Sequence, residues 1–375
     1  MKKERQSFFD VYGEITGDRE EWCYFSTHNP NYGIQDIFEE NHAIDFIKSV
    51  FKNGAKDKAL QIIYDSRFPM QRSRSNHTLS AYLLGLVIRN RMHIDMKELP
   101  KVNKAPTKNF LYFWSLTCLY HDFTVALEDD SAKYLDKLGT IEDFFQYFHI
   151  EYSLLEDNAD GSLIKNYYLY RIEKNKKVDH GLASAILLFD ALMKQYNEAR
   201  SVTMAKKGET FFYNDLKYSA GFEEHIRLVA NTIAKHNMWR ADKKLIDVYK
   251  KYNLQELIPS KNNTHIVFLE GQSKNDKEKL LFLLGLVDTI EPIKCLGRVN
   301  NVERIKNPYI ALEKLKIEFN YKKGEIRIEG PRTIIKDYGQ NIAGAKQWLG
   351  VTVEEIGAQQ VVRIIKSKMR KNSST

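Results

Sequence analysis

The sequence of 375 residues lacks the features that mark disulfide-rich secreted domains and membrane proteins. It contains only 3 cysteines, Cys23, Cys118 and Cys295, which are widely spaced and odd in number, so neither a disulfide framework nor a cysteine zinc site is expected. No apolar run approaches the length of a membrane span, and no apolar signal core follows the lysines at positions 2 and 3. We therefore expect a cytoplasmic protein without membrane contact.

A surplus of positive charge is missing from most of the chain. Residues 1–292 carry 40 Lys and Arg against 41 Asp and Glu, a net charge of −1, whereas residues 293–375 carry 17 against 8, a net charge of +9. A basic module of this kind attracts polyanions, nucleic acid first. It contains no known nucleic-acid motif, and a solubilising basic tail accounts for the same charge. Both interpretations stay open.

The pattern of apolar residues divides the chain into three parts. Residues 1–66 are predicted to be a helical and irregular segment packed on the core, and residues 67–293 to be a helical core domain. Residues 294–375 are predicted to be a small α/β appendage. In that appendage apolar residues alternate from Tyr309 onward, YKKGE supplies a turn, and the alternation resumes at Ile326, which is typical of a β-hairpin. A helix over residues 331–349 and a strand within residues 361–365 complete it.

The core domain is organised around the stretch Leu111–Asp129, LYFWSLTCLYHDFTVALED, which is predicted to be one helix. His121 and Asp122 lie within its apolar face. A buried carboxylate is costly unless it is paired, and a metal cation is a suitable partner. An HD dipeptide alone is weak support for a metal site, so the case depends on other segments with the same pattern.

Four further segments place a ligand-type residue on an apolar helical stripe. Three- and four-residue steps bring side chains to one helix face, so these residues are expected to point into a shared core. Helical bundles build metal sites in this way. The residues are His77, His180, Asp288 and the pair His225 and His236, which are eleven positions apart.

The order His, His-Asp, Asp resembles the HD superfamily of metal-dependent phosphohydrolases. The resemblance covers residues 73–292 and is carried by His77 in SNHTLSAYLLG, His121 and Asp122 in CLYHDF, and Asp288 in LLGLVDTIEP. Further matches are His180 in VDHGLASAILL and His236 in IAKHNMW. It implies a mainly α fold, an HD-type helical bundle that carries the small α/β appendage, and it implies that the extra histidines complete a second ion site.

Mixed imidazole and carboxylate ligands suit divalent transition metals such as Mn, Fe, Co, Ni or Zn better than Mg. One ion is expected on His77, His121, Asp122 and Asp288, and a second on His180, His225 and His236 with Asp122 as the bridge. A structural, hydrogen-bonded role is the alternative for His225. Asp122, His180 and Arg74 are the predicted catalytic residues, and Arg74 is chosen because arginine grips phosphate in a fork close to His77.

The predicted function is metal-dependent hydrolysis of a phosphoester, with a phosphorylated small molecule, a nucleotide or nucleotide-derived signal, as the substrate. A nuclease that holds RNA or DNA through the basic C-terminal module is the first alternative. A non-catalytic nucleotide-sensing module is the second. Phe123-Thr124-Val125 stands where many superfamily members have Gly-Lys, and Glu128-Asp129 is displaced from the acidic pair of the alarmone hydrolases. The first departure counts against a CRISPR-type HD nuclease that uses such a lysine, and the second counts against an alarmone hydrolase.

Overall fold

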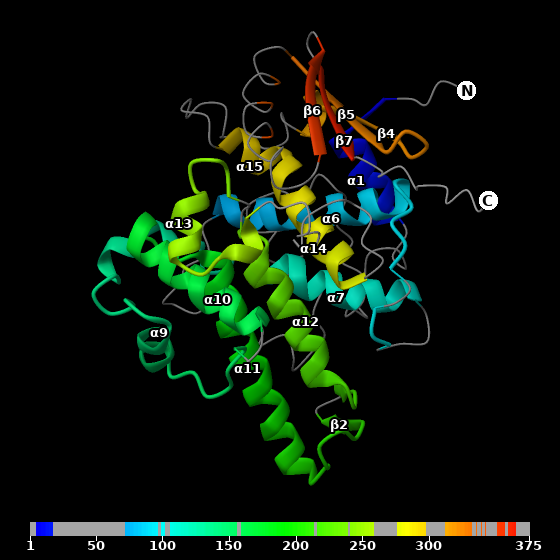
Figure 1. Cartoon of the computed structure of the whole chain (residues 1–375). Helices are drawn as coiled ribbons and strands as arrows, with labels where there is room; N and C mark the ends of the chain where they lie inside the picture. The colour runs from blue at the N-terminus through cyan, green and yellow to red at the C-terminus, as the bar shows by residue number, and fades with distance from the viewer. Residues whose placement is uncertain are drawn as a thin grey trace, which may run out of the picture.

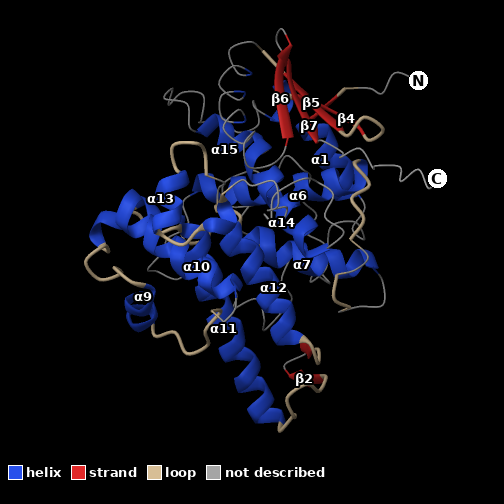
Figure 2. Cartoon of the chain, viewed as in Figure 1, coloured by secondary structure: helices blue, strands red, loops and turns tan. Residues whose placement is uncertain are grey.

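The structure, a computed structural model, describes residues 5–17, 72–96, 99–101, 106–155, 159–213, 216–238, 241–258, 276–297, 312–331, 335, 339, 342, 351–356 and 359–364. Within these ranges the chain is mainly helical and carries a small sheet at one end (Figure 2). Most of the predicted N-terminal segment and most of the predicted helix over residues 331–349 lie outside them. No helix in the described part of the chain has the length and apolar character that crossing a bilayer requires.

Five helices pack on one another in the middle of the molecule (Figure 1). Helix α12 contacts α11, α7 and α14, while α6 contacts α7 and α14. Their buried faces form one continuous apolar core, because each helix is lined by Leu, Ile, Val and aromatic residues. The five are α6 (Arg72–Arg91), α7 (Pro106–Tyr120), α11 (His180–Thr203), α12 (Phe222–Lys235) and α14 (Asp276–Ile290).

The closest approach between α6 and α7 depends on Gly85. A Cβ atom built on Gly85 would lie 1.9 Å from Cζ2 of Trp114, so a side chain does not fit there. The indole is fully buried, and its Nε1–H donates to the carbonyl of Tyr82 over 2.9 Å. Gly85 therefore sets the distance between two helices that border the candidate site.

We expect Gly85→Ala to destabilise the protein by at least about 1–3 kcal/mol, because the added methyl group must displace either the indole or a helix backbone. Chemical denaturation would measure the change. Gly139→Ala is the matched control, since the nearest atom to its built Cβ is Asp143 Oδ2 at 3.6 Å, an ordinary contact. That variant should change stability by less than about 0.5 kcal/mol. Equal stabilities for the two variants would contradict the packing argument.

Shorter helices surround the central five. Helix α9 begins where Thr140 and Asp143 form a reciprocal capping box, which satisfies two backbone amides that the first turn leaves open. Helix α10 continues into a π-helical turn, Arg171–Asn175, just before α11. The remaining bounds are α1 (Phe8–Gly17), α8 (Val125–Asp129), α9 (Ile141–Phe148), α10 (Ala159–Tyr170), α13 (Ile246–Lys251) and α15 (Pro292–Gly297).

The sheet has five antiparallel strands in the order β1-β4-β5-β7-β6. Its strands are β1 (Gln6–Ser7), β4 (Lys316–Asn320), β5 (Glu325–Glu329), β6 (Val351–Ile356) and β7 (Gln359–Ile364). The predicted hairpin is confirmed as β4–β5, and the predicted C-terminal strand as β7. The first strand of this hairpin, β4, starts at Lys316. Residues 312–314, which belong to the predicted alternating stretch, are helical. A separate hairpin, β2 (Phe211–Tyr213) and β3 (Leu216–Tyr218), lies at the far end of α11.

The prediction of one helix over Leu111–Asp129 is wrong. Helix α7 ends at Tyr120, four residues form a turn, and α8 begins at Val125. His121 Nδ1 lies 2.6 Å from the carbonyl oxygen of Cys118, an acceptor that the next helical turn would use. Thr124 Oγ1 donates to the carbonyl of His180 over 2.8 Å and so ties the turn to α11. His121 and Asp122 therefore lie in a turn between two helices.

Candidate metal centre

Two histidines of the site occupy the same kind of position, directly after the last residue of a helix. His121 follows α7 and His236 follows α12. In each case Nδ1 lies 2.6 Å from the carbonyl oxygen three residues earlier, Cys118 or Ile233. The last carbonyls of a helix lack amide partners, so the imidazole satisfies one of them. Each ring is thereby oriented with Nε2 pointing away from its own helix end.

The other two histidines are held by carboxylates. His77 in α6 has its Nδ1 2.7 Å from Oε2 of the fully buried Glu291. His180, the first residue of α11, contacts Glu128 Oε2 through Nδ1, and its backbone amide donates to the same oxygen over 3.1 Å. An acceptor at Nδ1 keeps the proton of a neutral imidazole there and leaves the Nε2 lone pair for a metal.

Four side chains from three parts of the chain form the first ligand group: His77, His121, Asp122 and Asp288. Nε2 of His77 lies 3.5 Å from Asp122 Oδ2 and 3.3 Å from Asp288 Oδ1. Nε2 of His121 lies 3.5 Å from Asp122 Oδ1 and 3.6 Å from Asp288 Oδ1. One ligand atom from each of the four residues lies within 4.8 Å of the others. All four residues are buried, so the group can hold a metal ion shielded from water.

A second ligand group contains Asp122, His180 and His236. Nε2 of His180 lies 3.0 Å from Asp122 Oδ1 and 2.9 Å from Nδ2 of Asn237. The rings of His121 and His236 meet edge to face with their centroids 5.4 Å apart. Asp122 belongs to both groups, which is the position of a carboxylate that bridges two ions.

The two carboxylates of the first group favour their charged form. Burial alone would raise the pKa of Asp122, but His121, His180 and Lys294 hold it well below its usual range. Burial acts on Asp288 in the same direction, and Lys294, His121 and His77 likewise hold the pKa of Asp288 well below its usual range. Two buried carboxylates that stay ionised attract positive charge, which a divalent cation supplies.

The histidines divide into two classes by charge. Burial lowers the pKa of His236 to about 3, with help from His121 and His180, so this imidazole is neutral. Burial would also lower the pKa of His77, but Asp288 and Glu291 outweigh it and raise this pKa to about 9. For His180, Asp122 and Glu128 overcome burial and raise the pKa to about 10. The acidic surroundings that cause these increases also favour a metal cation.

The donor set suits a transition metal. Nε2 of His77, His121 and His236 is buried and has no hydrogen-bond partner among the residues that the structure describes. A buried imidazole nitrogen without a hydrogen-bond partner is costly unless a ligand binds it. Imidazole and carboxylate together suit Mn, Fe, Co, Ni or Zn. The observation supports a metal ion at this position without identifying it.

The structure does not bring His225 to either group. Its Nδ1 lies 3.2 Å from Ser219 Oγ, and its ring meets Phe113 edge to face. His225 and His236 share a helix face, but eleven residues advance roughly 16 Å along a helix axis, which exceeds the span of one site. Arg74 lies in α6, one turn before His77, and its side chain is outside the described part of the structure.

Sequence reasoning did not assign a role in the site to four residues that support it: Glu128, Asn237, Glu291 and Lys294. Glu291 follows Asp288 by three residues, so spacing could have indicated it. Glu128 follows Asp122 by six residues across a helix break, and no helical periodicity connects them. Asn237 and Lys294 reach the site only through the packing of α12 and α15. Each supporting residue contacts a ligand that was identified from sequence.

We expect Glu128→Gln to weaken metal binding at the second group by about 10- to 100-fold, because outer partners of this kind orient a ligand and set its basicity. Competition with a chromogenic chelator would measure both affinities. Glu142→Gln is the control, since Glu142 pairs with Lys165 on the exposed surface. If Glu128→Gln binds both ions as tightly as the control does, the side-chain contact to His180 has no role in the site.

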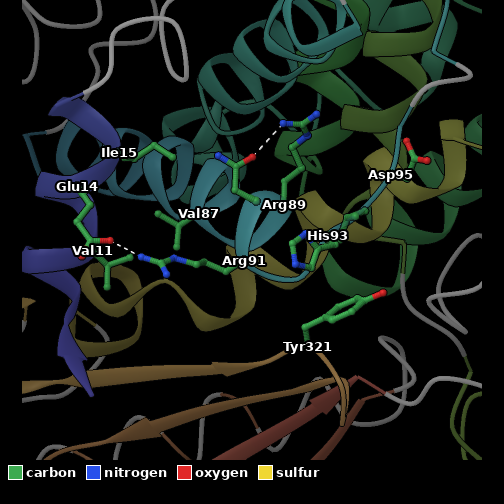
Figure 3. Close-up of a pocket in the computed structure, with 11 residues that line it drawn as sticks. Val11, Glu14, Ile15, Val87, Arg89, Arg91, His93, Asp95 and Tyr321 are labelled. Atoms are coloured by element: carbon green, nitrogen blue, oxygen red, sulfur yellow. Dashed lines mark hydrogen bonds and ion pairs between the residues drawn. The ribbon is translucent and has the colours of Figure 1, made fainter. Parts of the chain in front are cut away.

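A cavity of about 790 Å³ lies elsewhere, between α1, the C-terminal end of α6 and the β4–β5 turn (Figure 3). Arg91 reaches toward α1 and pairs with Glu14, while the His93 and Tyr321 rings meet edge to face with centroids 4.6 Å apart. None of the residues in the two ligand groups lines this cavity. It belongs to the junction between the N-terminal helix and the sheet.

Comparison of the chain with family models, with curated proteins and with solved structures gives no significant match. The geometry of the site itself is therefore the evidence that bears on function. That geometry consists of two buried ligand groups that share the carboxylate of Asp122. In each of the four histidines, Nδ1 contacts a hydrogen-bond acceptor.

Proposed function

We propose that the protein is a metal-dependent phosphohydrolase of the HD type, which hydrolyses a phosphoester of a nucleotide or nucleotide-derived signal. The observation that carries the proposal is the convergence of His77, His121, Asp122 and Asp288 in one buried group, in the order His, His-Asp, Asp along the chain. The second group, Asp122 with His180 and His236, supports a two-ion site.

The protein's own residues supply binding, orientation and exclusion of water. A bound divalent ion polarises a phosphoryl oxygen and lowers the pKa of a coordinated water. His77, His121, Asp122 and Asp288 would hold the first ion, and His180 and His236 would hold the second together with Asp122. Glu291 and Glu128 orient two of the imidazoles through Nδ1. Because the ligands are buried, water does not solvate the carboxylates fully, and their negative charge attracts a cation in the site more strongly.

The side chains of the site differ in how far they are buried. His180, Lys294 and Asp288 have side-chain exposures of 14%, 12% and 9%, whereas His77 and His121 have 2% and 0%. A phosphoester would therefore approach from the side of the second ligand group and α15, and an attacking water and a leaving group would exchange with solvent there.

Elemental analysis of the purified protein, followed by assays of metal-loaded protein on nucleoside phosphates and cyclic nucleotides, tests the proposal. We expect transition metal in the protein and release of phosphate or nucleoside that stops on chelation. Long RNA and DNA belong in the same assays, because the +9 charge of residues 293–375 supports nucleic acid as the alternative substrate. Cleavage of those polymers alone, with an affinity that falls steeply with salt, would favour the nuclease. Metal-loaded protein that hydrolyses none of these substrates would contradict the proposal.

A further inference from the structure

A lysine lies at the least buried edge of the candidate metal centre, and neither ligand group includes it. Lys294 in α15 contacts Asp288 Oδ1 through its ammonium group, and its side chain is 12% exposed. Glu291 holds the backbone of Lys294 in place. Oε2 of Glu291 accepts from the amide of Lys294 over 2.7 Å and lies 2.7 Å from Nδ1 of His77. The same carboxylate therefore orients a metal ligand and the backbone that carries Lys294.

Lys294 and a metal ion would compete for one oxygen atom. Asp288 Oδ1 is also the oxygen that lies 3.3 Å from Nε2 of His77 and 3.6 Å from Nε2 of His121, so it faces the first ligand group. A metal ion held by Asp288 Oδ1 would lie close to the ammonium group, because both would contact the same oxygen. Two cations that lie so close repel each other. An anion between them removes the repulsion.

We propose that Lys294 binds the phosphoryl oxygens of the substrate beside the metal, so that one anionic group bridges the ammonium and the ion. The inference rests on the proposed function, because it names the group of that site that contacts the phosphoester. Lysine suits this task as a point charge on a flexible stem, and its stem allows Nζ to move from Asp288 to an incoming phosphate. The amino group neither gains nor loses a bond to phosphorus.

This role accounts for the charge arrangement around α15. Lys294 acts electrostatically on both Asp122 and Asp288, so it lies close to the carboxylates of both ligand groups. It lies beside the side chains of the site that are least buried. Phosphoryl transfer places negative charge on the equatorial oxygens, and a fixed cation at that edge stabilises it.

The test compares Lys294→Met, Lys294→Arg and Lys279→Met. Methionine keeps the length and apolar stem of lysine without the charge, and arginine restores the charge. Lys279 lies in α14 and donates to the backbone carbonyl of Asp95 over 2.8 Å at the surface, so Lys279→Met removes one lysine charge away from the candidate metal centre. Inorganic phosphate is the probe, titrated into Zn²⁺-loaded protein by calorimetry, with zinc content measured on the same samples.

We expect Lys294→Met to bind phosphate about 10- to 100-fold more weakly at unchanged zinc content, as the loss of one charge-assisted contact predicts. Lys294→Arg should recover most of the affinity, and Lys279→Met should match the wild type. Unchanged phosphate affinity in Lys294→Met would overturn the proposal. So would loss of zinc from that variant, because Lys294 would then support the metal site. Wild-type protein that binds zinc and phosphate but hydrolyses no phosphoester would refute the proposed function while leaving this contact intact.

Discussion

Purified Asp122→Asn should contain almost no metal and should have no phosphohydrolase activity. Asp122 is the one residue that belongs to both ligand groups of the described structure, so its replacement removes an anionic ligand from each. Asparagine keeps the volume of the side chain but offers a neutral oxygen. Loss of an outer partner already weakens metal binding by about 10- to 100-fold, and loss of a bridging ligand should exceed that. Elemental analysis would give the metal content per chain.

The control for this experiment is Asp129→Asn. Asp129 is exposed at the end of α8, seven residues after Asp122. Its replacement by Asn removes the same charge from the same segment of the chain. It should keep both ions and full activity. Circular dichroism and thermal unfolding of both variants would establish that the fold persists. Full metal occupancy in Asp122→Asn would show that the ion, if present, binds elsewhere.

The burial of His77 and Asp288 on helix faces was predictable because it depends only on residue type and helical spacing. His77 and Asp288 lie inside helices, as the apolar stripes around them indicated. The core could be predicted for the same reason, since α6 and α14 are apolar over several turns. For these two residues the helix continues on both sides, so the apolar periodicity indicates correctly which way the side chain points.

Prediction from apolar periodicity failed where a helix ended at the histidine. His121 and His236 each follow a helix, and each uses Nδ1 to bond a carbonyl of the last turn. Apolar periodicity does not indicate such a helix end, because the histidine side chain itself competes for the hydrogen-bond acceptors of the helix. His225 was grouped with His236 because the two have nearly the same angular position around the helix. Angular position alone cannot show that they lie three turns apart. Likewise, β1 pairs with β4 across more than 300 residues, which local pattern cannot reveal.

Helix ends at the site also have an electrostatic consequence. The C-terminal ends of α7 and α12 both reach the candidate metal centre, because His121 and His236 follow them directly. The C-terminal end of a helix carries partial negative charge and favours a cation by about 0.3–1 kcal/mol. Placing ligands there adds to the attraction that Asp122 and Asp288 exert. The helix break that sequence reasoning missed is therefore part of what suits the site to a metal ion.

His236→Ala should reduce the metal content from two ions per chain to one. Only the second group includes His236, whose Nε2 is buried and has no hydrogen-bond partner among the described residues, whereas the first group keeps all of its ligands. His180→Ala should give the same stoichiometry, because it removes a different ligand of the same ion. Elemental analysis after dialysis against metal-free buffer would count the ions.

His225→Ala is a closely matched control for His236→Ala, since His225 is a buried histidine in α12, the helix that His236 directly follows, and belongs to neither group. It should retain two ions even if it is somewhat less stable, because its contacts to Ser219 and Phe113 support packing. Two ions in all three variants would leave a second site independent of His180 and His236. One ion in wild-type protein and in every variant would reduce the centre to His77, His121, Asp122 and Asp288. In that case His180 and His236 would serve the substrate or the packing, and only the first ligand group would be a metal site.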